Sequence, residues 1–284
     1  MISLVNCQKK YNDFTLDISL EIPAGRVTGL LGRNGAGKST TLKAILGLIR
    51  PSGGEVRVFD KNPREFSCQD KEALGVALSY SGFNEDFSVE SVISVLRKMY
   101  PQFDEASFRL LCKQQEIPLR KPIRSFSTGM KAKLKVIIAV THNAKLLVLD
   151  EPTAGLDVIA RNEILDLLRN YLAEDEERTV LISSHISSDL EGFCDDVCLI
   201  DNGRLVFHED TDTILQSYGV LKLSSEEYGK IEKEYLLASR KESFGYACLT
   251  KEKQYFLDNY PGIVVENGSL DSVIILMLGK EQFS

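Results

Sequence analysis

The chain has 284 residues, 43% of them hydrophobic, so it can bury a sizeable core as one large domain or as one domain with an appendage. Its net charge of −7 argues against nucleic-acid binding, because phosphate recognition usually needs a basic face. We find no secretory signal and no apolar stretch near the roughly 20 residues that span a bilayer, so we expect a soluble chain that reaches a membrane only through a partner.

The cysteines and histidines do not have metal-site spacing. The six cysteines are Cys7, Cys68, Cys112, Cys194, Cys198 and Cys248. No pair is spaced as C-x-x-C, and the three histidines are scattered. We therefore expect buried, reduced thiols of a cytosolic protein and no zinc site.

The first quarter of the chain alternates strand and helix patterns. Residues 14–22 alternate apolar and polar side chains, which is typical of a half-buried antiparallel strand. Residues 26–31 form a nearly continuous apolar run, which favours a strand covered on both faces. A glycine-rich turn then leads into a helical pattern over 39–49, and a turn and another strand follow within 51–60.

The glycine-rich turn reads GRNGAGKST and fits the phosphate-loop pattern G-x-x-x-x-G-K-[ST]. Its glycines let the backbone turn tightly and point N–H groups at phosphate oxygens. Lys38 would reach the β- and γ-phosphates, and the Ser39 hydroxyl can ligate Mg²⁺. The candidate nucleotide-binding residues of this loop are Gly32, Arg33, Asn34, Gly35, Ala36, Gly37, Lys38, Ser39 and Thr40.

Residues 88–142 have mostly helical periodicity interrupted by prolines, which predicts an inserted helical subdomain. Within it, residues 123–140 place Ser127 and Gly129 at the expected N-terminus of a helix. Small hydroxyls and unhindered N–H groups at that position favour an anion. The sequence therefore predicts a second anion site besides the phosphate loop.

Strand patterns return at 145–150, 179–184 and 196–201, with a helix over 158–172 between the first two. This alternation indicates a mainly parallel α/β sheet. The turn at 201–204 is typical of a hairpin that joins the last of these strands to a neighbour.

The strand pattern at 146–151 ends in two acidic residues, Asp150 and Glu151, which we expect to face the ligand crevice of the sheet. Asp150 would hold Mg²⁺ together with Ser39. Glu151 is placed to orient or deprotonate an attacking water. His185 follows the strand at 179–184, and we expect it beside the γ-phosphate.

Taken together, GRNGAGKST, SFSTGM, LLVLDEPTAGLD and SSH resemble the nucleotide-binding subunit of an ABC transporter, over residues 1 to about 215. The resemblance implies a P-loop NTPase fold: a RecA-like α/β core, an antiparallel β-subdomain and a helical subdomain. It also implies ATP and Mg²⁺, a head-to-tail dimer of two such subunits, and an integral membrane permease that holds this subunit in the cytoplasm at the inner face of the cell membrane. By the same resemblance Tyr11 stacks on adenine, Asp157 lies at the dimer interface, and His185 contacts the γ-phosphate.

The chain departs from the family pattern in two places. The usual signature Leu-Ser-Gly-Gly-Gln appears as residues 126–130, with Thr128 and Met130 as the changed positions. The glutamine expected after the strand GVALS is missing, and Ser79 or Ser81 stands near its place. These changes bear on phosphate contacts and on coupling to the permease.

Beyond residue 215 the sequence has no recognisable chemical motif. We interpret residues 1–215 as the ATP-binding domain and 216–284 as a small α+β appendage with a structural or regulatory role. The leading hypothesis is an ATPase that powers export of a peptide or drug-like compound. Two alternatives are a catalytically weak half of a heterodimer and a soluble ABC ATPase without a transport role. The sequence leaves open the substrate, the direction of transport and whether the dimer partner is a second copy.

Overall fold

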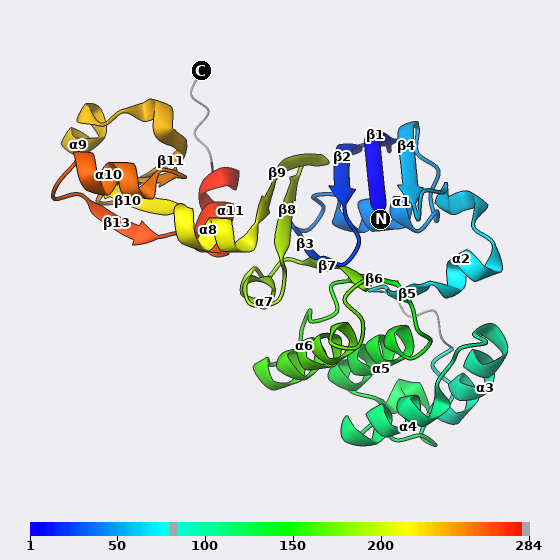
Figure 1. The fold of residues 1–284 in the computed structure, drawn as a ribbon. Coiled ribbons are helices and arrows are strands. Elements are labelled where there is room, and N and C mark those ends of the chain that lie inside the picture. Colours follow the sequence, from blue (N-terminus) through cyan, green and yellow to red (C-terminus); the bar gives the residue numbers. More distant parts are fainter. Residues whose placement is uncertain (80–83, 280–284) are drawn as a thin grey trace.

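A computed structural model describes residues 1–79 and 84–279 and is built around a six-stranded sheet (Figure 1). The strands of this sheet are β3 (Val27–Leu31), β5 (Leu74–Ala77), β6 (Leu146–Asp150), β7 (Thr179–Ser184), β8 (Asp196–Asp201) and β9 (Arg204–Asp210). Their order is β5-β6-β7-β3-β8-β9, and every neighbouring pair is parallel except the hairpin of β8 and β9. The α/β fold with a mainly parallel sheet is confirmed.

The two faces of the sheet belong to two different hydrophobic clusters, because successive side chains of a strand point to opposite faces. In β6, Leu146 and Val148 pack in one cluster, whereas Leu147 and Leu149 pack in the other. All five residues of β6 are buried. A strand covered on both faces must be apolar throughout, which explains the continuous runs in the sequence.

The first of these clusters lies between the six-stranded sheet and a second, three-stranded antiparallel sheet. Its strands are β1 (Ile2–Lys10), β2 (Thr15–Ile22) and β4 (Gly53–Val58). The predicted strands at 14–22 and 51–60 are confirmed as β2 and β4. Both pair with β1, the central strand of this sheet, which the sequence analysis did not predict.

The helices of this part of the chain are α1 (Lys38–Ile45), α2 (Cys68–Glu72), α3 (Val89–Met99), α4 (Glu105–Gln114), α5 (Thr128–Val140), α6 (Val158–Leu172) and α7 (Ser188–Glu191). The first of them packs between the two sheets, where its buried Leu42 and Ile45 join the three-stranded side of the core. Helices α5 and α6 supply buried side chains to the opposite cluster. Figure 1 shows α3 to α6 together below the six-stranded sheet.

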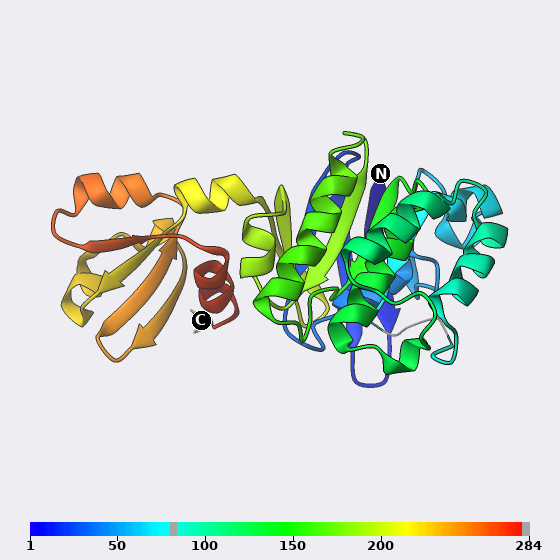
Figure 2. The ribbon, with the colours of Figure 1, turned by 90° about the horizontal axis from the view of Figure 1, so that it is seen from below.

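The C-terminal residues form a third sheet. Its elements are α8 (Thr211–Ser217), β10 (Gly219–Leu223), α9 (Ser225–Lys230), β11 (Leu236–Glu242), β12 (Gly245–Thr250), α10 (Lys253–Asn259), β13 (Val264–Asn267) and α11 (Leu270–Leu278). The strand order is β11-β12-β10-β13, and all pairs are antiparallel. Figures 1 and 2 show α11 between this sheet and the rest of the molecule.

All six cysteines are free thiols, and five of them are buried. The exception is Cys68 at the start of α2, which is exposed, so the expectation of buried thiols is wrong for this residue. Burial raises the pKa of Cys112 and of Cys248 to about 12. Over residues 1–79 and 84–279 no helix has the length and apolar character needed to cross a membrane, and no cluster of metal-ligating side chains of three or more is found.

Candidate active site

The phosphate loop connects the end of β3 to the start of α1, and two of its glycines have backbone conformations that other residues rarely adopt. Gly32 has a φ of 153°, and a Cβ at this position would lie 2.4 Å from the carbonyl oxygen of Ile200. Gly37 has a φ of 118° and lies against the side chain of Phe14. The loop is therefore held closely between β8 and the turn after β1.

Lys38, the first residue of α1, has a buried side chain that is 5% exposed. Its Nζ donates to the carbonyl oxygen of Gly32 at 2.7 Å and lies 3.0 Å from Oε1 of Glu151. The loop backbone thus fixes this cation, and the cation in turn faces the carboxylate at the end of β6. A fixed positive charge beside a glycine-rich loop suits a polyphosphate ligand.

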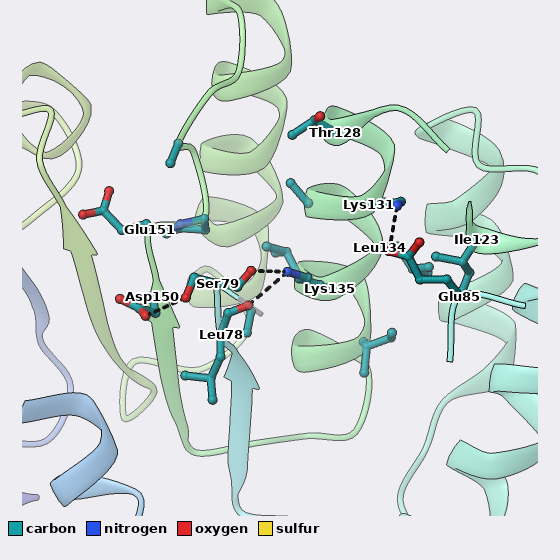
Figure 3. A pocket seen from close by; sticks show the side chains of 16 residues that line it. Leu78, Ser79, Glu85, Ile123, Thr128, Lys131, Leu134, Lys135, Asp150 and Glu151 are labelled. Carbon is teal, nitrogen blue, oxygen red and sulfur yellow. Dashed lines mark hydrogen bonds and ion pairs between the residues drawn. The ribbon is translucent and has the colours of Figure 1, made fainter. Parts of the chain in front are cut away.

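Asp150 is the last residue of β6, and hydroxyl groups from three other segments converge on its buried carboxylate. Ser39 Oγ lies 3.0 Å from Oδ2, Ser79 Oγ lies 3.2 Å from Oδ2, and Ser183 Oγ lies 2.8 Å from Oδ1. The approach of Ser79 to Asp150 is drawn in Figure 3. A carboxylate with hydroxyl oxygens around it is a hard-oxygen donor set, so these residues fit a Mg²⁺ ion.

Glu151 comes directly after Asp150 but has different partners. Its backbone φ is 52°, its N–H donates to Ser183 Oγ at 2.9 Å, and its Oε2 lies 2.6 Å from Nδ1 of His185. The His185 N–H also points to Oε2, at 3.3 Å. Lys38, Glu151 and His185 therefore form one chain of charged and polar contacts across the ends of three segments.

The predicted second anion site lies at the neighbouring N-termini of α5 and α6. Ser127 caps α5 by accepting from the N–H of Met130 at 3.2 Å, and Asp157 caps α6 by accepting from the N–H of Ala160 at 2.8 Å. A Cβ on Gly129 would lie 3.7 Å from Cβ of Ala160, so the two helix ends are in contact. Ser127 is exposed, which leaves this positive end open to a ligand from outside.

Tyr11 lies beyond the other side of the phosphate loop. Tyr11 is 47% exposed, and the centroid of its ring lies 6.3 Å from that of Phe14. Phe14 in turn reaches within 3.1 Å of the position of a Cβ on Gly37. The chain Tyr11–Phe14–Gly37 thus places an exposed aromatic ring next to the loop.

A cavity of about 340 Å³ lies between the ends of β5 and β6 and the helix α5 (Figure 3). Apolar side chains such as Leu134 and Ile138 form much of its wall, and Asp150 and Glu151 lie at its edge. Ser79, one of the two serines considered in place of the glutamine, lines this cavity, whereas Ser81 lies outside the described residues.

Sequence reasoning missed Ser183 as a partner of the carboxylates. The signal was present, because Ser183 and Ser184 directly precede His185 at the end of the strand at 179–184. Parallel pairing sets Asp150 opposite Ser183, so a polar residue at the end of β7 necessarily lies next to the end of β6. The pattern of each strand does not show that β6 and β7 are neighbours in the sheet, because strand pairing is set by the tertiary fold.

Comparison with protein families gives two matches. A model described as "ABC transporter" matches residues 15–154. A model described as an AAA domain, putative AbiEii toxin of a type IV TA system, matches residues 121–188. Together the two matches span the phosphate loop, both acidic residues and His185.

Similar sequences include three bacterial proteins. The chain is 31% identical over 207 residues to the ABC transporter ATP-binding protein YtrB of Bacillus subtilis (strain 168), covering 73% of this chain and 70% of YtrB. It is 32% identical over 215 residues to the lantibiotic transport ATP-binding protein SrtF of Streptococcus pyogenes, covering 75% and 92%. It is 34% identical over 212 residues to the bacitracin transport ATP-binding protein BcrA of Enterococcus faecalis, covering 72% and 68%.

Similar solved structures include one described as the ATP binding subunit of an ABC transporter. It has a TM-score of 0.67 and 25% identity, and the match covers 75% of this chain and 91% of that one. Another is an ATP-binding cassette described as a dimer in a post-hydrolysis state bound to ADP and Pi. Its TM-score is 0.65 at 20% identity, with 74% and 99% covered, so this second likeness shows the fold alone.

Proposed function

The chain belongs to the ATP-binding subunits of ABC transporters and is an ATP hydrolase of that family, and we propose that it powers export of a peptide or drug-like compound through a separate membrane permease. The observation that carries the catalytic part of this proposal is the convergence of Lys38, Ser39, Asp150, Glu151 and His185. These side chains come from different elements that meet at the carboxyl ends of the parallel strands, which is where ligands bind in such sheets.

In this proposal the N–H groups of the loop 32–40 and the Lys38 ammonium bind the phosphates of ATP. Tyr11 provides an exposed ring on which adenine stacks. Ser39 and Asp150 would hold Mg²⁺, which supplies positive charge against the phosphate oxygens when it is bound. The hydroxyls of Ser79 and Ser183 orient the Asp150 carboxylate toward that role.

Glu151 positions the attacking water and accepts its proton during in-line displacement at the γ-phosphate. Two contacts support this role: His185 holds Oε2 at 2.6 Å, and Lys38 faces Oε1 at 3.0 Å. Since both oxygens are restrained by neighbours, the carboxylate enters the reaction already oriented. His185 is 41% exposed at its side chain, so its other ring nitrogen can reach a phosphate oxygen.

The complete site requires a second ATP-binding subunit arranged head-to-tail. Ser127, Gly129 and Asp157 lie at the adjoining N-termini of α5 and α6, where an anion held by another chain is favoured. The dimeric cassette with the same fold supports this arrangement. One chain thus carries two half-sites, and association becomes part of the mechanism.

The relatives support the proposed substrate class and partner. SrtF and BcrA are described as transport proteins for a lantibiotic and for bacitracin, which supports export of a peptide-like compound. Because these relatives are described as ATP-binding proteins of transport systems, the transport path would belong to an integral permease chain. The subunit would then work in the cytoplasm at the inner face of the membrane, with residues 1–215 as its ATP-binding domain, 88–142 as the helical subdomain and 216–284 as an accessory unit.

The variant Glu151→Gln tests this proposal, because Gln keeps the shape of the side chain and removes the base. We expect wild-type protein to hydrolyse ATP in the presence of Mg²⁺, and the variant to lose activity on the order of 10²–10⁴-fold. Size-exclusion chromatography should then show that the variant dimerises only when ATP is added. Glu55→Gln, which changes an exposed carboxylate of β4, serves as the matched control and should behave as wild type.

The same experiment separates the alternative of a catalytically weak heterodimer half. The altered signature residues Thr128 and Met130 are the observation that favours this alternative. The heterodimer alternative predicts two results: wild-type protein binds ATP without hydrolysing it, and the Glu151→Gln variant stays monomeric at saturating ATP. Both together would favour a heterologous partner over a homodimer.

A further inference from the structure

The end of β5 is weakly supported by the sheet itself. β5 is an edge strand with β6 as its neighbour on one side, and the ladder ends at the pair Ala77–Leu149. Two residues further on, exposed Ser79 places its hydroxyl 3.2 Å from Oδ2 of Asp150. A contact with Asp150 therefore depends on backbone that the strand ladder no longer holds.

Lys135 supplies the missing support from the helix opposite. Its Nζ donates to the carbonyl oxygen of Leu78 at 3.1 Å and to that of Ser79 at 3.0 Å (Figure 3). An ammonium group offers three donors, so one side chain can fix two successive carbonyl groups. The backbone at Leu78 and Ser79 is thus tied to α5 across the cavity.

The other lysines of α5 are used differently. Lys131 pairs with Glu85 at 2.8 Å, and Lys133 pairs with Glu163 at 2.5 Å. Lys135 instead donates hydrogen bonds to backbone carbonyl groups, and its side chain is partly buried. Burial, and secondarily the positive charge of Lys131, lower the pKa of Lys135. The chain thus keeps a charged group in an unfavourable environment beside the end of β5.

We propose that Lys135 is a positioning residue for ATP hydrolysis, which holds the Leu78–Ser79 backbone so that the Ser79 hydroxyl stays on Asp150. This inference rests on the proposed function, in which Asp150 and Ser39 hold Mg²⁺ with ATP. Helix α5 then acts at two places. Ser127 at its N-terminus would contact the phosphate of the other subunit, and Lys135 in its middle holds the backbone of Ser79, whose hydroxyl contacts Asp150. A shift of α5 on engaging a phosphate therefore reaches the carboxylate of its own subunit through Lys135 and Ser79.

The test compares Lys135→Met with Lys131→Met, which removes an ammonium group one turn earlier on the same helix. Two readouts are measured in the full chain: Mg²⁺ dependence of ATP hydrolysis, and Mg²⁺ dependence of binding of a fluorescent ATP analogue. We expect Lys135→Met to raise the Mg²⁺ concentration at half-maximal response several-fold in both readouts, and to lower kcat by about tenfold with little change in the KM for ATP. Lys131→Met should leave both Mg²⁺ midpoints as in wild type.

Two further variants keep the inference falsifiable. Ser79→Ala should shift the Mg²⁺ midpoints in the same direction, and the double variant with Lys135→Met should shift them no further than the larger single effect, because both act through one contact. Lys135→Arg keeps the charge and N–H donors in a different geometry, so it should shift the Mg²⁺ midpoints less than Lys135→Met does. Fully additive shifts, or a lower melting temperature with unchanged Mg²⁺ midpoints, would overturn the proposal.

The binding readout separates this inference from the proposed function. A wild-type protein that binds the analogue in a Mg²⁺-dependent way but does not hydrolyse ATP contradicts the catalytic proposal, and the Lys135 comparison still gives a result. A wild-type protein that hydrolyses ATP, with Lys135→Met indistinguishable from Lys131→Met, contradicts the inference alone.

Discussion

At the scale of single residues, the backbone at Glu151 explains how two neighbouring carboxylates serve different partners. A φ of 52° is unusual for a residue with a side chain and costs about 1–2 kcal/mol. It turns the Glu151 carboxylate toward Lys38 and His185, while Asp150 keeps its serine hydroxyls. Strain of this kind persists where the surroundings fix the residue, as at functional sites.

The phosphate loop offers a matched pair of glycines on which backbone and steric effects can be separated. Both Gly32 and Gly35 have positive φ values, 153° and 82°. A Cβ on Gly35 would meet no atom within 4 Å, whereas one on Gly32 would lie 2.4 Å from the carbonyl oxygen of Ile200. We expect each Ala substitution to cost about 1–3 kcal/mol of backbone strain, and Gly32→Ala a further amount of about 1–3 kcal/mol from overlap.

Urea unfolding without nucleotide measures both variants against wild type. The free energy of unfolding should fall more for Gly32→Ala than for Gly35→Ala, and ligand effects do not enter under these conditions. Equal losses would show that β8 moves away from the loop at no cost, and that the close packing at Gly32 does not restrain the site.

The sequence singles out the residues of the phosphate loop and of the acidic pair, because they stand in contiguous motifs. Lys38 and Ser39 lie where the loop pattern puts them, beside Glu151 and Asp150. Lys135 could not be found in this way. In the sequence, Lys135 is one of several charged residues of a predicted helix, and nothing in the pattern indicates its partners. These are carbonyl groups more than fifty residues away in the chain.

At the scale of secondary-structure elements, the unpredicted β1 has a physical explanation. Its buried positions alternate only as far as Leu4, and the register shifts between Leu4 and Cys7. Asn6, inside this irregularity, has a φ of 47°. A bulge breaks the period of two, so the strand loses the pattern by which β2 was predicted. Similarly, the predicted helix 39–49 ends early because Gly47 has a φ of 67°.

Helices α3 and α4 are joined by a network of ion pairs around Arg109. Its guanidinium binds both oxygens of Glu90, at 2.8 and 2.7 Å, and one oxygen of Glu105 at 2.8 Å. Glu105 also receives hydrogen bonds from Arg97. Hydrogen bonds from Arg97 first, and then from Arg109, lower the pKa of Glu105 to about 2.

This lowered pKa predicts how acid acts on the helical subdomain. The stability that Glu105 contributes is fully present above its unfolded pKa of about 4.3, and it is lost as the pH falls from there through about 2. We therefore expect Glu105→Gln to lower the melting temperature near neutral pH, and the difference from wild type to shrink as the pH falls below about 4. Circular dichroism at a series of pH values measures it.

Glu116→Gln is the control for this experiment, since Glu116 lies beyond the end of α4 and makes no ion pair within the described residues. Its melting temperature should follow that of wild type at every pH. A constant difference between Glu105→Gln and wild type across the pH range would mean that the ion pairs do not contribute to stability. Added salt should reduce the neutral-pH difference, because the network is partly exposed to solvent.

At the scale of the whole molecule, the C-terminal sheet meets the ATP-binding core through α11. Leu270 and Val273 of this helix are buried in the same cluster as Leu190 of α7. Next to them the carboxylate of Asp271 accepts a hydrogen bond from Ser187 Oγ. Figure 2 shows α11 between the C-terminal sheet and the core. The accessory unit thus touches the chain two residues beyond His185.

From this contact we predict that the C-terminal unit stabilises residues 185–191, the segment whose His185 contacts Glu151. Asp271→Ala removes the acceptor for buried Ser187, so residues 185–191 should open more often and exchange their amide hydrogens faster. Because His185 contacts Glu151 at 2.6 Å through its ring, we expect kcat for ATP hydrolysis to fall several-fold with little change in KM. Hydrogen-exchange mass spectrometry and steady-state kinetics measure the two effects.

Asp258→Ala on α10, whose carboxylate contacts Gln254 of the same helix, is the matched control. Unchanged exchange over 185–191 in Asp271→Ala would mean that α11 anchors the accessory unit without acting on the site.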